Sequence, residues 1–244
     1  MAQHETVFDM KQPWLLLDTS SPQGVVAVWQ DGLVCAQMAL PHFRQHAEML
    51  SGAVSHCLKQ ARVAFHELAG IAVGQGPGSF VGVRIAMAHA KGMACALGIG
   101  MVGVPTLLAL AAGESKPVGQ RVLVLLDARR AQVFAQQVLY LHMPECSWVL
   151  PVAQGCPVAL SQKQVMQETK QVDCVIACRL QQAWLDALGS KQIVQVHGPT
   201  AVGMGRMLVA HLAQEGLPDR RGCGELQPVY VRSPDARLPT GRVI

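Results

Sequence analysis

One short pattern occurs twice in this chain and constrains its fold more than any other feature. An apolar strand ends in aspartate, and the chain then turns back into a second strand. Residues 14–17 lead into Asp18, and residues 121–126 lead into Asp127. Repetition of one supersecondary unit predicts two related lobes, each with its own sheet.

The repeat divides the chain into a polar leader at residues 1–13, a first lobe at 14–115 and a second lobe at 116–244. In the first lobe, Asp31-Gly32 separates two apolar runs. This dipeptide predicts a tight hairpin, because both of its turn positions need a positive φ.

Elsewhere the spacing of apolar residues predicts alternating helices and strands, as in an α/β fold. In the first lobe we expect helices at 42–62 and 79–97, strands at 68–74 and 100–104, and a helix from Thr106. In the second lobe we expect strands at 131–139, 172–177 and 192–197, with helices beginning at Ser161, ending at Gly189, and covering 200–214.

The composition favours a globular protein without a dedicated nucleic-acid surface. Half of the residues are hydrophobic, and the formal net charge of +4 comes from scattered Lys and Arg. A nucleic-acid-binding domain would concentrate these residues in one patch. The leader lacks the basic start and the apolar core of a signal peptide, so we expect no such peptide.

The eight cysteines form no CxxC pair, which predicts reduced thiols rather than disulfides or zinc and points to the cytosol. Residues 92–113 carry no charge, but Gly98, Gly100, Gly103 and Pro105 interrupt them. We therefore predict a helix end, a buried strand and a new helix there, and no membrane span.

The glycine-rich connection after residue 74 is the sharpest local motif. Gly76, Gly78 and Ser79 lie between a predicted strand and a predicted helix, with Ser79 as the expected N-cap. A helix N-terminus of this kind favours a phosphate or another anion. A tight strand-to-helix connection also requires glycine, and spacing alone leaves both interpretations open.

The predicted helix that follows carries a row of small residues at every fourth position: Gly82, Ala86, Ala90 and Ala94. A row without bulky side chains lets another element approach closely. The row could pack on the sheet of this chain or on a helix of another subunit, and spacing favours neither.

These segments together resemble the TsaB (YeaZ-like) family. Residues 76–84 read GPGSFVGVR, close to the GPGSFTGLR signature of that family. Supporting matches follow in the right order: Asp18-Thr19-Ser20, Asp127-Ala128-Arg129, and Pro228-Val229-Tyr230-Val231-Arg232. The resemblance covers about residues 14–232, with departures at Val81, Ala86, Val231 and in the leader.

The resemblance implies an actin-like, ribonuclease-H-like fold with two βββαβα lobes, the second reduced. It implies a cytoplasmic subunit that supports the catalytic homologue TsaD, together with the ATPase TsaE, in placing threonylcarbamoyl on adenosine 37 of tRNAs reading codons that start with A. It also leaves open a homodimer and weak ATP or ADP binding. Contact with tRNA would be indirect, through the complex.

The resemblance also assigns candidate residues. A phosphate or nucleotide would meet Asp18, Thr19, Ser20, Gly76, Gly78, Ser79 and Asp127. The helices at 42–62 and 79–97 would form the subunit interface, through Leu50, Val54, Gly82, Ala86, Ala90 and Ala94.

No catalytic residue and no metal site is expected in this chain. The catalytic relatives carry a His-x-x-x-His metal pair, and Thr106 and Leu110 stand at the matching positions here. His42 and His46 share a helical spacing but lack further ligands, which favours a solvated helix start over a metal site.

Two further hypotheses remain. The chain could be a stand-alone actin-like ATPase or small-molecule kinase that uses Asp18 and the glycine loop. It could also contact tRNA through its C-terminal arginines, although acidic residues among them favour a solvated tail. These arginines are Arg220, Arg221, Arg232, Arg237 and Arg242.

Overall fold

The computed structural model describes residues 11–41, 45–144, 146, 148–219 and 224–231. Its first sheet has the strand order β3-β2-β1-β4-β5. The bounds are β1 (Trp14–Asp18), β2 (Gly24–Gln30), β3 (Leu33–Leu40), β4 (Gly70–Gly76) and β5 (Gly100–Pro105). β1, β2 and β3 pair antiparallel, whereas β4 runs parallel to both β1 and β5.

The second sheet has the order β11-β10-β6-β7-β8, with β9 also paired to β7. Its strands are β6 (Arg121–Asp127), β7 (Gln132–Met143), β8 (Trp148–Ala153), β9 (Val158–Ser161), β10 (Cys174–Cys178) and β11 (Gln192–Val196). Read from its antiparallel end, this sheet repeats the first one, because β8, β7, β6, β10 and β11 take the places of β3, β2, β1, β4 and β5.

The helices follow the same repeat. They are α1 (His46–Ala61), α2 (Phe80–Leu97) and α3 (Thr106–Ala112) in the first half, and α4 (Gln162–Glu168), α5 (Gln182–Ala187) and α6 (Ala201–Glu215) in the second. Short 3-10 turns lie at η2 (Phe65–Glu67) and η3 (Thr169–Gln171). The predicted actin-like fold with two βββαβα lobes and a reduced second lobe is confirmed, since α4 and α5 are much shorter than their counterparts.

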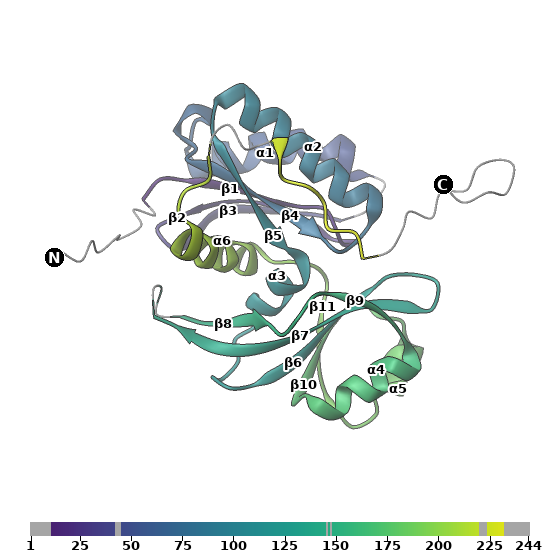
Figure 1. The fold of residues 1–244 in the computed structure, drawn as a ribbon. Coiled ribbons are helices and arrows are strands. Elements are labelled where there is room, and N and C mark those ends of the chain that lie inside the picture. The colour runs from purple at the N-terminus through teal and green to yellow at the C-terminus, as the bar shows by residue number, and fades with distance from the viewer. Residues whose placement is uncertain (1–10, 42–44, 145, 147, 220–223, 232–244) are drawn as a thin grey trace, which may run out of the picture.

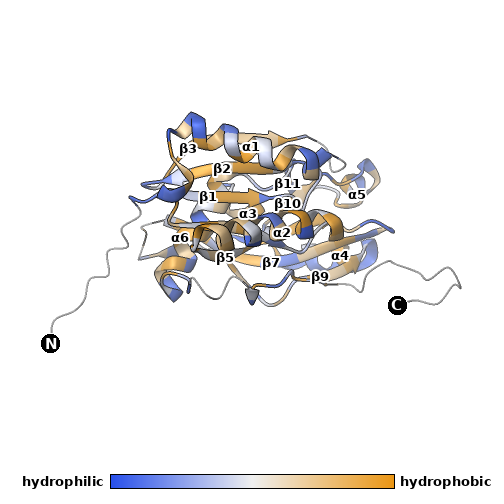
Figure 2. Ribbon diagram, turned by 90° about the horizontal axis from the view of Figure 1, so that it is seen from above, coloured by the Kyte–Doolittle hydropathy of each residue, from blue (hydrophilic) through white to orange (hydrophobic). Residues whose placement is uncertain are grey.

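Five layers stack in space (Figure 1). α1 and α2 cover the outer face of the first sheet, and α4 and α5 cover the outer face of the second. α3 and α6 lie between the sheets. Coloured by hydropathy, the strands are mostly apolar and the hydrophilic residues gather at turns and on outward helix surfaces (Figure 2). This is the distribution expected when each sheet buries both of its faces.

The central helices are exchanged between the lobes. α6 follows the second sheet in sequence, yet Met204, Leu208 and Leu212 pack on the first sheet. α3 follows the first sheet, yet Leu107 and Leu110 pack on the second. The predicted boundary between residues 115 and 116 therefore falls between α3 and β6, and each half supplies a layer to the other.

The uncharged stretch 92–113 divides as predicted into the end of α2, the buried strand β5 and the new helix α3. Among the helices in the described ranges, α2 alone has the length and apolar composition that a membrane crossing requires, and the core helix of a soluble protein meets the same criterion. Its buried side packs against the first sheet.

Candidate functional site

Asp18 lies at the end of β1 with its side chain completely buried. Its Oδ1 accepts hydrogen bonds from the Ser20 amide at 2.7 Å and from the Ser20 hydroxyl at 2.6 Å. The Thr106 hydroxyl donates to Oδ2 at 3.3 Å. Burial raises the pKa of Asp18, although these hydrogen bonds act in the opposite direction.

Neighbouring glycines close the space around this turn. A Cβ at Gly74 would overlap with the Asp18 carboxylate, and one at Gly82 would overlap with the Thr19 carbonyl. A Cβ at Gly78 would lie 2.5 Å from the Ser20 carbonyl oxygen. The glycines therefore allow close packing between the turn at 18–20 and the loop at 76–82.

Hydrogen bonds join the same two segments. The Ser79 amide donates to the Ser20 carbonyl at 2.7 Å, and the Thr19 hydroxyl donates to the Gly82 carbonyl at 2.6 Å. Ser79 caps α2 as predicted, because its hydroxyl accepts from the Gly82 amide at 3.2 Å. A phosphate at this helix start would have to compete with Ser20 and Ser79 for two of the amides.

The C-terminal segment 224–231 covers the outer side of the glycine loop. The Val229 amide donates to the Gln75 carbonyl at 2.7 Å, and the Gln75 amide side chain donates to the Gln227 carbonyl at 2.8 Å. A Cβ at Gly76 would lie 2.9 Å from the Val229 carbonyl oxygen. We call residues 224–231 the strap. In Figure 1 it is the yellow segment that runs beside β5 and α2.

The second aspartate turn is built differently from the first. Asp127 is exposed, and its Oδ1 accepts from the Arg129 amide at 2.8 Å. Arg129, Arg130 and Ala131 all have positive φ values, of 60°, 53° and 53°. The two aspartates also affect Cys178 on β10. Burial raises the pKa of this thiol to about 12, and the negative charges of Asp18 and Asp127 raise it further. The structure thus brings six predicted site residues together and leaves Asp127 in the second lobe. The six are Asp18, Thr19, Ser20, Gly76, Gly78 and Ser79.

The positions where the resemblance places metal-binding histidines in the catalytic relatives hold Thr106 and Leu110 in this chain. Thr106 is buried and forms hydrogen bonds with Asp18, Ser20 and the Gly76 amide. Leu110 lies in the hydrophobic core beside the second sheet. No group of three or more His, Cys, Asp or Glu side chains suited to a metal occurs among the described residues. His42 lies outside the described residues. The prediction of a solvated His46 is wrong, because its ring is buried and its Nε2 lies 3.2 Å from the Leu40 carbonyl oxygen.

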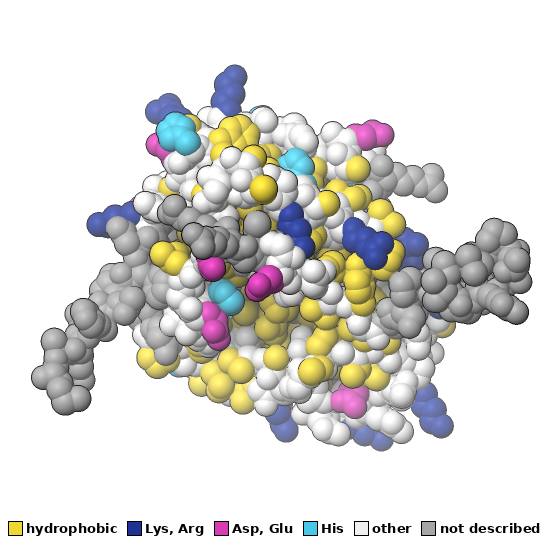
Figure 3. Space-filling view, turned by 45° about the horizontal axis from the view of Figure 1, so that its top comes forward, with side chains coloured by type: hydrophobic (Ala, Val, Ile, Leu, Met, Phe, Trp, Pro, Cys, Tyr) yellow, Lys and Arg dark blue, Asp and Glu magenta, His cyan; other side chains and the backbone are white. Residues whose placement is uncertain are grey.

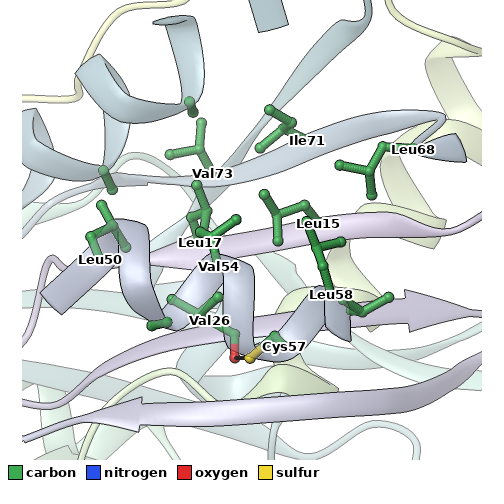
Figure 4. Packing of buried hydrophobic residues seen from close by; sticks show 14 of the residues in the cluster. Leu15, Leu17, Val26, Leu50, Val54, Cys57, Leu58, Leu68, Ile71 and Val73 are labelled. Carbon is green, nitrogen blue, oxygen red and sulfur yellow. Dashed lines mark hydrogen bonds between the residues drawn. The ribbon is translucent and has the colours of Figure 1, made fainter. Parts of the chain in front are cut away.

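The residue-level interface prediction needs correction. Leu50 and Val54 point from α1 into the core, toward strand residues such as Leu17 and Val26 (Figure 4). On α2, the row of small residues packs against the protein's own sheet and the turn at 18–20. Its three alanines, Ala86, Ala90 and Ala94, are at most 1 % exposed, and Gly82 lies against Thr19. The row thus explains how closely α2 approaches the sheet. An interface through the helices themselves stays a prediction.

The opposite side of α2 carries the exposed Arg84 near its start and several small exposed residues further along. Val81 is 63 % exposed, and it is followed along the same side by three small exposed residues and a thiol, namely Ala88, Gly92, Ala96 and Cys95. Gly92 has nothing within 4 Å of the place of a Cβ. The outward side of α1 adds Ser51, Gly52 and Ser55. We call these eight residues the outer row.

Seven cysteines are free within the described part of the chain: Cys35, Cys57, Cys95, Cys146, Cys156, Cys174 and Cys178. Three of them are buried, and burial raises the pKa of Cys57 to about 11. The five C-terminal arginines named as candidate tRNA contacts lie outside the described residues.

Parts of this chain are similar in sequence to known proteins. A family model described as "TsaD: tRNA N6-adenosine threonylcarbamoyltransferase" matches residues 40–143. The tRNA threonylcarbamoyladenosine biosynthesis protein TsaB of Escherichia coli (strain K12) is 36% identical over 121 residues, which are 49% of this chain and 52% of that protein. The TsaB protein of Bacillus subtilis (strain 168) is 32% identical over 120 residues, again 49% of this chain and 52% of the relative.

A solved structure extends the likeness to nearly the whole chain. A Pseudomonas aeruginosa protein, described as uncharacterized with similarity to peptidase YEAZ, superposes with a TM-score of 0.74 and 25% identity, covering 91% of this chain and 100% of that one. These likenesses support an assignment of the chain to the TsaB (YeaZ-like) family. In sequence, the match spans about half the length of the curated TsaB relatives.

The structure adds features to the TsaB signature that sequence reasoning missed. Tyr230 of the strap stacks on Phe80 of the signature, with ring centroids 5.1 Å apart, and its hydroxyl bonds Arg84. Gly198 packs against Gln23, so that the second lobe also closes on the first aspartate turn. The only sequence signal for the first contact was the joint presence of the two TsaB-like motifs.

Proposed function

We propose that this chain is a non-catalytic subunit of the cytoplasmic bacterial machinery that forms threonylcarbamoyl-adenosine at position 37 of tRNAs reading codons that start with A. The observation that carries the proposal is the contrast between a closed aspartate turn and an exposed outer row of mostly small residues. The names of the TsaB relatives and the match to the transferase family model support the pathway.

The state of the first turn argues for a supporting role. A phosphate-binding or metal-binding aspartate must reach its ligand, whereas Asp18 is buried and bonded to Ser20 and Thr106. Thr106 and Leu110 replace the histidines of the catalytic relatives, and a leucine side chain offers a metal nothing to bind. The chain would therefore contribute shape and contacts rather than a reacting group, with no cofactor of its own.

The outer row provides a surface for a helical partner. Side chains as small as Ala88 and Gly92 let a second helix backbone approach closely, as small residues do in other tightly packed helix pairs. We propose that a TsaD-like catalytic subunit occupies this surface, that a TsaE-like ATPase joins the pair, and that a second copy of this chain can take the same place when the catalytic subunit is absent. In this arrangement tRNA is contacted through the complex.

A pull-down with the TsaD-like homologue of the same organism tests this proposal. The wild-type chain should retain the homologue, and Ala88→Arg should abolish retention because an arginine on the outer row keeps the helices apart. Val118→Arg is the matched control, since Val118 is also exposed, at 58 %, but lies in the turn before β6. Loss of the homologue from both variants, or from neither, would contradict the proposed surface.

A further inference from the structure

Arg84 is held in one orientation by two aromatic rings. Its guanidinium carbon lies 3.8 Å from the centroid of the Phe80 ring and 5.6 Å from that of Tyr230. Its Nε donates a hydrogen bond of 2.8 Å to the Tyr230 hydroxyl. Phe80 and Arg84 are one helical turn apart on α2, whereas Tyr230 comes from the strap. The strap therefore fixes an arginine that would otherwise be a mobile surface side chain.

The terminal nitrogens of this arginine remain available. Arg84 is exposed, its hydrogen bond uses only Nε, and no carboxylate pairs with it in the ranges that the structure describes. A guanidinium that is already stacked and bonded at Nε presents its two Nη groups as a fixed planar fork. Such a fork matches a carboxylate in a bidentate pair and has already lost much of its rotamer freedom.

The surroundings of Arg84 are apolar. Val81 is 63 % exposed, Tyr230 is 42 % exposed, and Val229 is 36 % exposed. On the right-hand part of the face in Figure 3, basic side chains are bordered by apolar ones, while acidic side chains lie left of the centre and at the upper right and lower right of the view. An apolar border of this kind excludes water from a central charged contact when a partner covers it, as in interface hot spots.

We propose that Phe80, Arg84 and Tyr230 form a docking point for one Asp or Glu side chain of the catalytic homologue. The point lies at the N-terminal end of the outer row, so the inference rests on the proposed function and adds the chemistry of one contact to it. The outer row would supply close packing, and Arg84 would fix the register of the partner along α2. The strap takes part because Tyr230 holds the guanidinium in place.

A protein carboxylate suits this site better than a nucleic-acid phosphate. Lys91, the next basic residue on α2, is engaged with the Gly224 carbonyl at 3.1 Å. Phosphate tracking along a nucleic acid needs several adjacent cations. One fixed arginine inside an apolar border is instead typical of a protein interface.

The test is the affinity of full-length variants for the purified homologue, measured by isothermal titration calorimetry. Arg84→Met keeps the length and the apolar stem, and it should weaken binding about 10-fold or more. Arg84→Lys keeps the charge but not the fork, and it should lose most of the same affinity. Lys163→Glu, an exposed charge change on α4, is the control and should bind like the wild type. Thermal melting of each variant alone shows that the fold is retained.

A charge-reversal scan then identifies the contact. Arg84→Glu should abolish binding, and one Asp or Glu→Arg substitution in the homologue should restore it. Wild-type affinity in Arg84→Met would overturn the docking point while leaving the proposed function intact. Failure of the wild-type chain to bind the homologue would overturn both. Weakened binding that no acidic reversal restores, with tRNA binding lost in parallel, would assign Arg84 to nucleic acid and refute the proposal.

Discussion

The carboxylate of Asp18 lies directly against the Cα of Gly74, so that any side chain at position 74 would overlap with it. The side chain of Asp18 is thus enclosed by other residues of the protein. The hydroxyls of Ser20 and Thr106 complete its hydrogen bonding. The aspartate that begins the repeat has a structural role, and this role leads to a first prediction.

Relative to the wild type, Asp18→Asn should be more stable at neutral pH than at acidic pH. Burial raises the pKa of Asp18 above its ordinary value of 3.8, so the folded chain holds this proton more tightly than the unfolded chain does. The contribution of Asp18 to the free energy of unfolding is therefore full below 3.8 and falls as the pH rises through the raised value. Asparagine cannot titrate, and it can accept from Ser20 and donate to Thr106.

Urea unfolding of both proteins between about pH 4 and pH 8 measures this difference. We expect the free energy of unfolding of the variant to increase relative to that of the wild type as the pH rises. Asp18→Leu is a useful control, since it leaves the donors of Ser20 and Thr106 without an acceptor and should destabilise the fold at every pH. If the free energy of unfolding of the variant instead falls relative to that of the wild type as the pH rises, the Asp18 carboxyl is ionised in the folded protein and the prediction is wrong.

Two glycines of α2 should respond to alanine in opposite ways. Gly82→Ala would place its Cβ on the Thr19 carbonyl, and we expect it to lower the free energy of unfolding by about 1–3 kcal/mol or more. Gly92→Ala meets nothing within 4 Å and should stabilise the helix by about 0.5–1 kcal/mol. Denaturant titrations of the two variants and the wild type give the comparison. Equal effects at both positions would contradict the described orientation of α2.

The purified chain should not hydrolyse ATP in the presence of magnesium. Asp18 is buried, and the amides of Ser79 and Gly82 already donate within the chain. A phosphate-release assay measures turnover, and the isolated catalytic homologue with its own metal serves as a reference sample. Turnover that is lost in Asp18→Asn would instead support the ATPase or kinase hypothesis.

Deletion of the gene should deplete threonylcarbamoyl-adenosine from total tRNA. Nucleoside mass spectrometry of the deletion strain measures the modification directly. A plasmid copy of the wild type should restore it, whereas Ala88→Arg should not, because that variant lacks the proposed pairing surface. Normal levels in the deletion strain would exclude this chain from the pathway.

Much of the fold followed from local sequence. The Asp31-Gly32 turn has φ values of 52° and 76°, as the hairpin prediction required, and it joins the antiparallel strands β2 and β3. The missed strands were those that local rules discourage. β8 contains Pro151, which a central strand excludes, but β8 lies at the edge of its sheet, where proline is tolerated. β9 has only four residues and gives no periodic signal.

The candidate site was harder to predict, because its contacts join distant segments. Spacing revealed the row of Gly82, Ala86, Ala90 and Ala94, but it could not decide which side of α2 the sheet would cover. That choice depends on the turn at 18–20, more than 60 positions away in the sequence, as the Thr19–Gly82 hydrogen bond with a separation of 63 illustrates. The Arg84–Tyr230 contact spans 146 positions and has no local signal at all.

The exchange of α3 and α6 between the lobes has a consequence for how the protein is made. On the ribosome, the first sheet emerges long before α6, so its inner face waits for a helix that is translated roughly a hundred residues later. The two halves consequently form one cooperative unit, and a gene cut between residues 115 and 116 would yield two fragments that each expose an apolar sheet face and become soluble only when they are co-expressed.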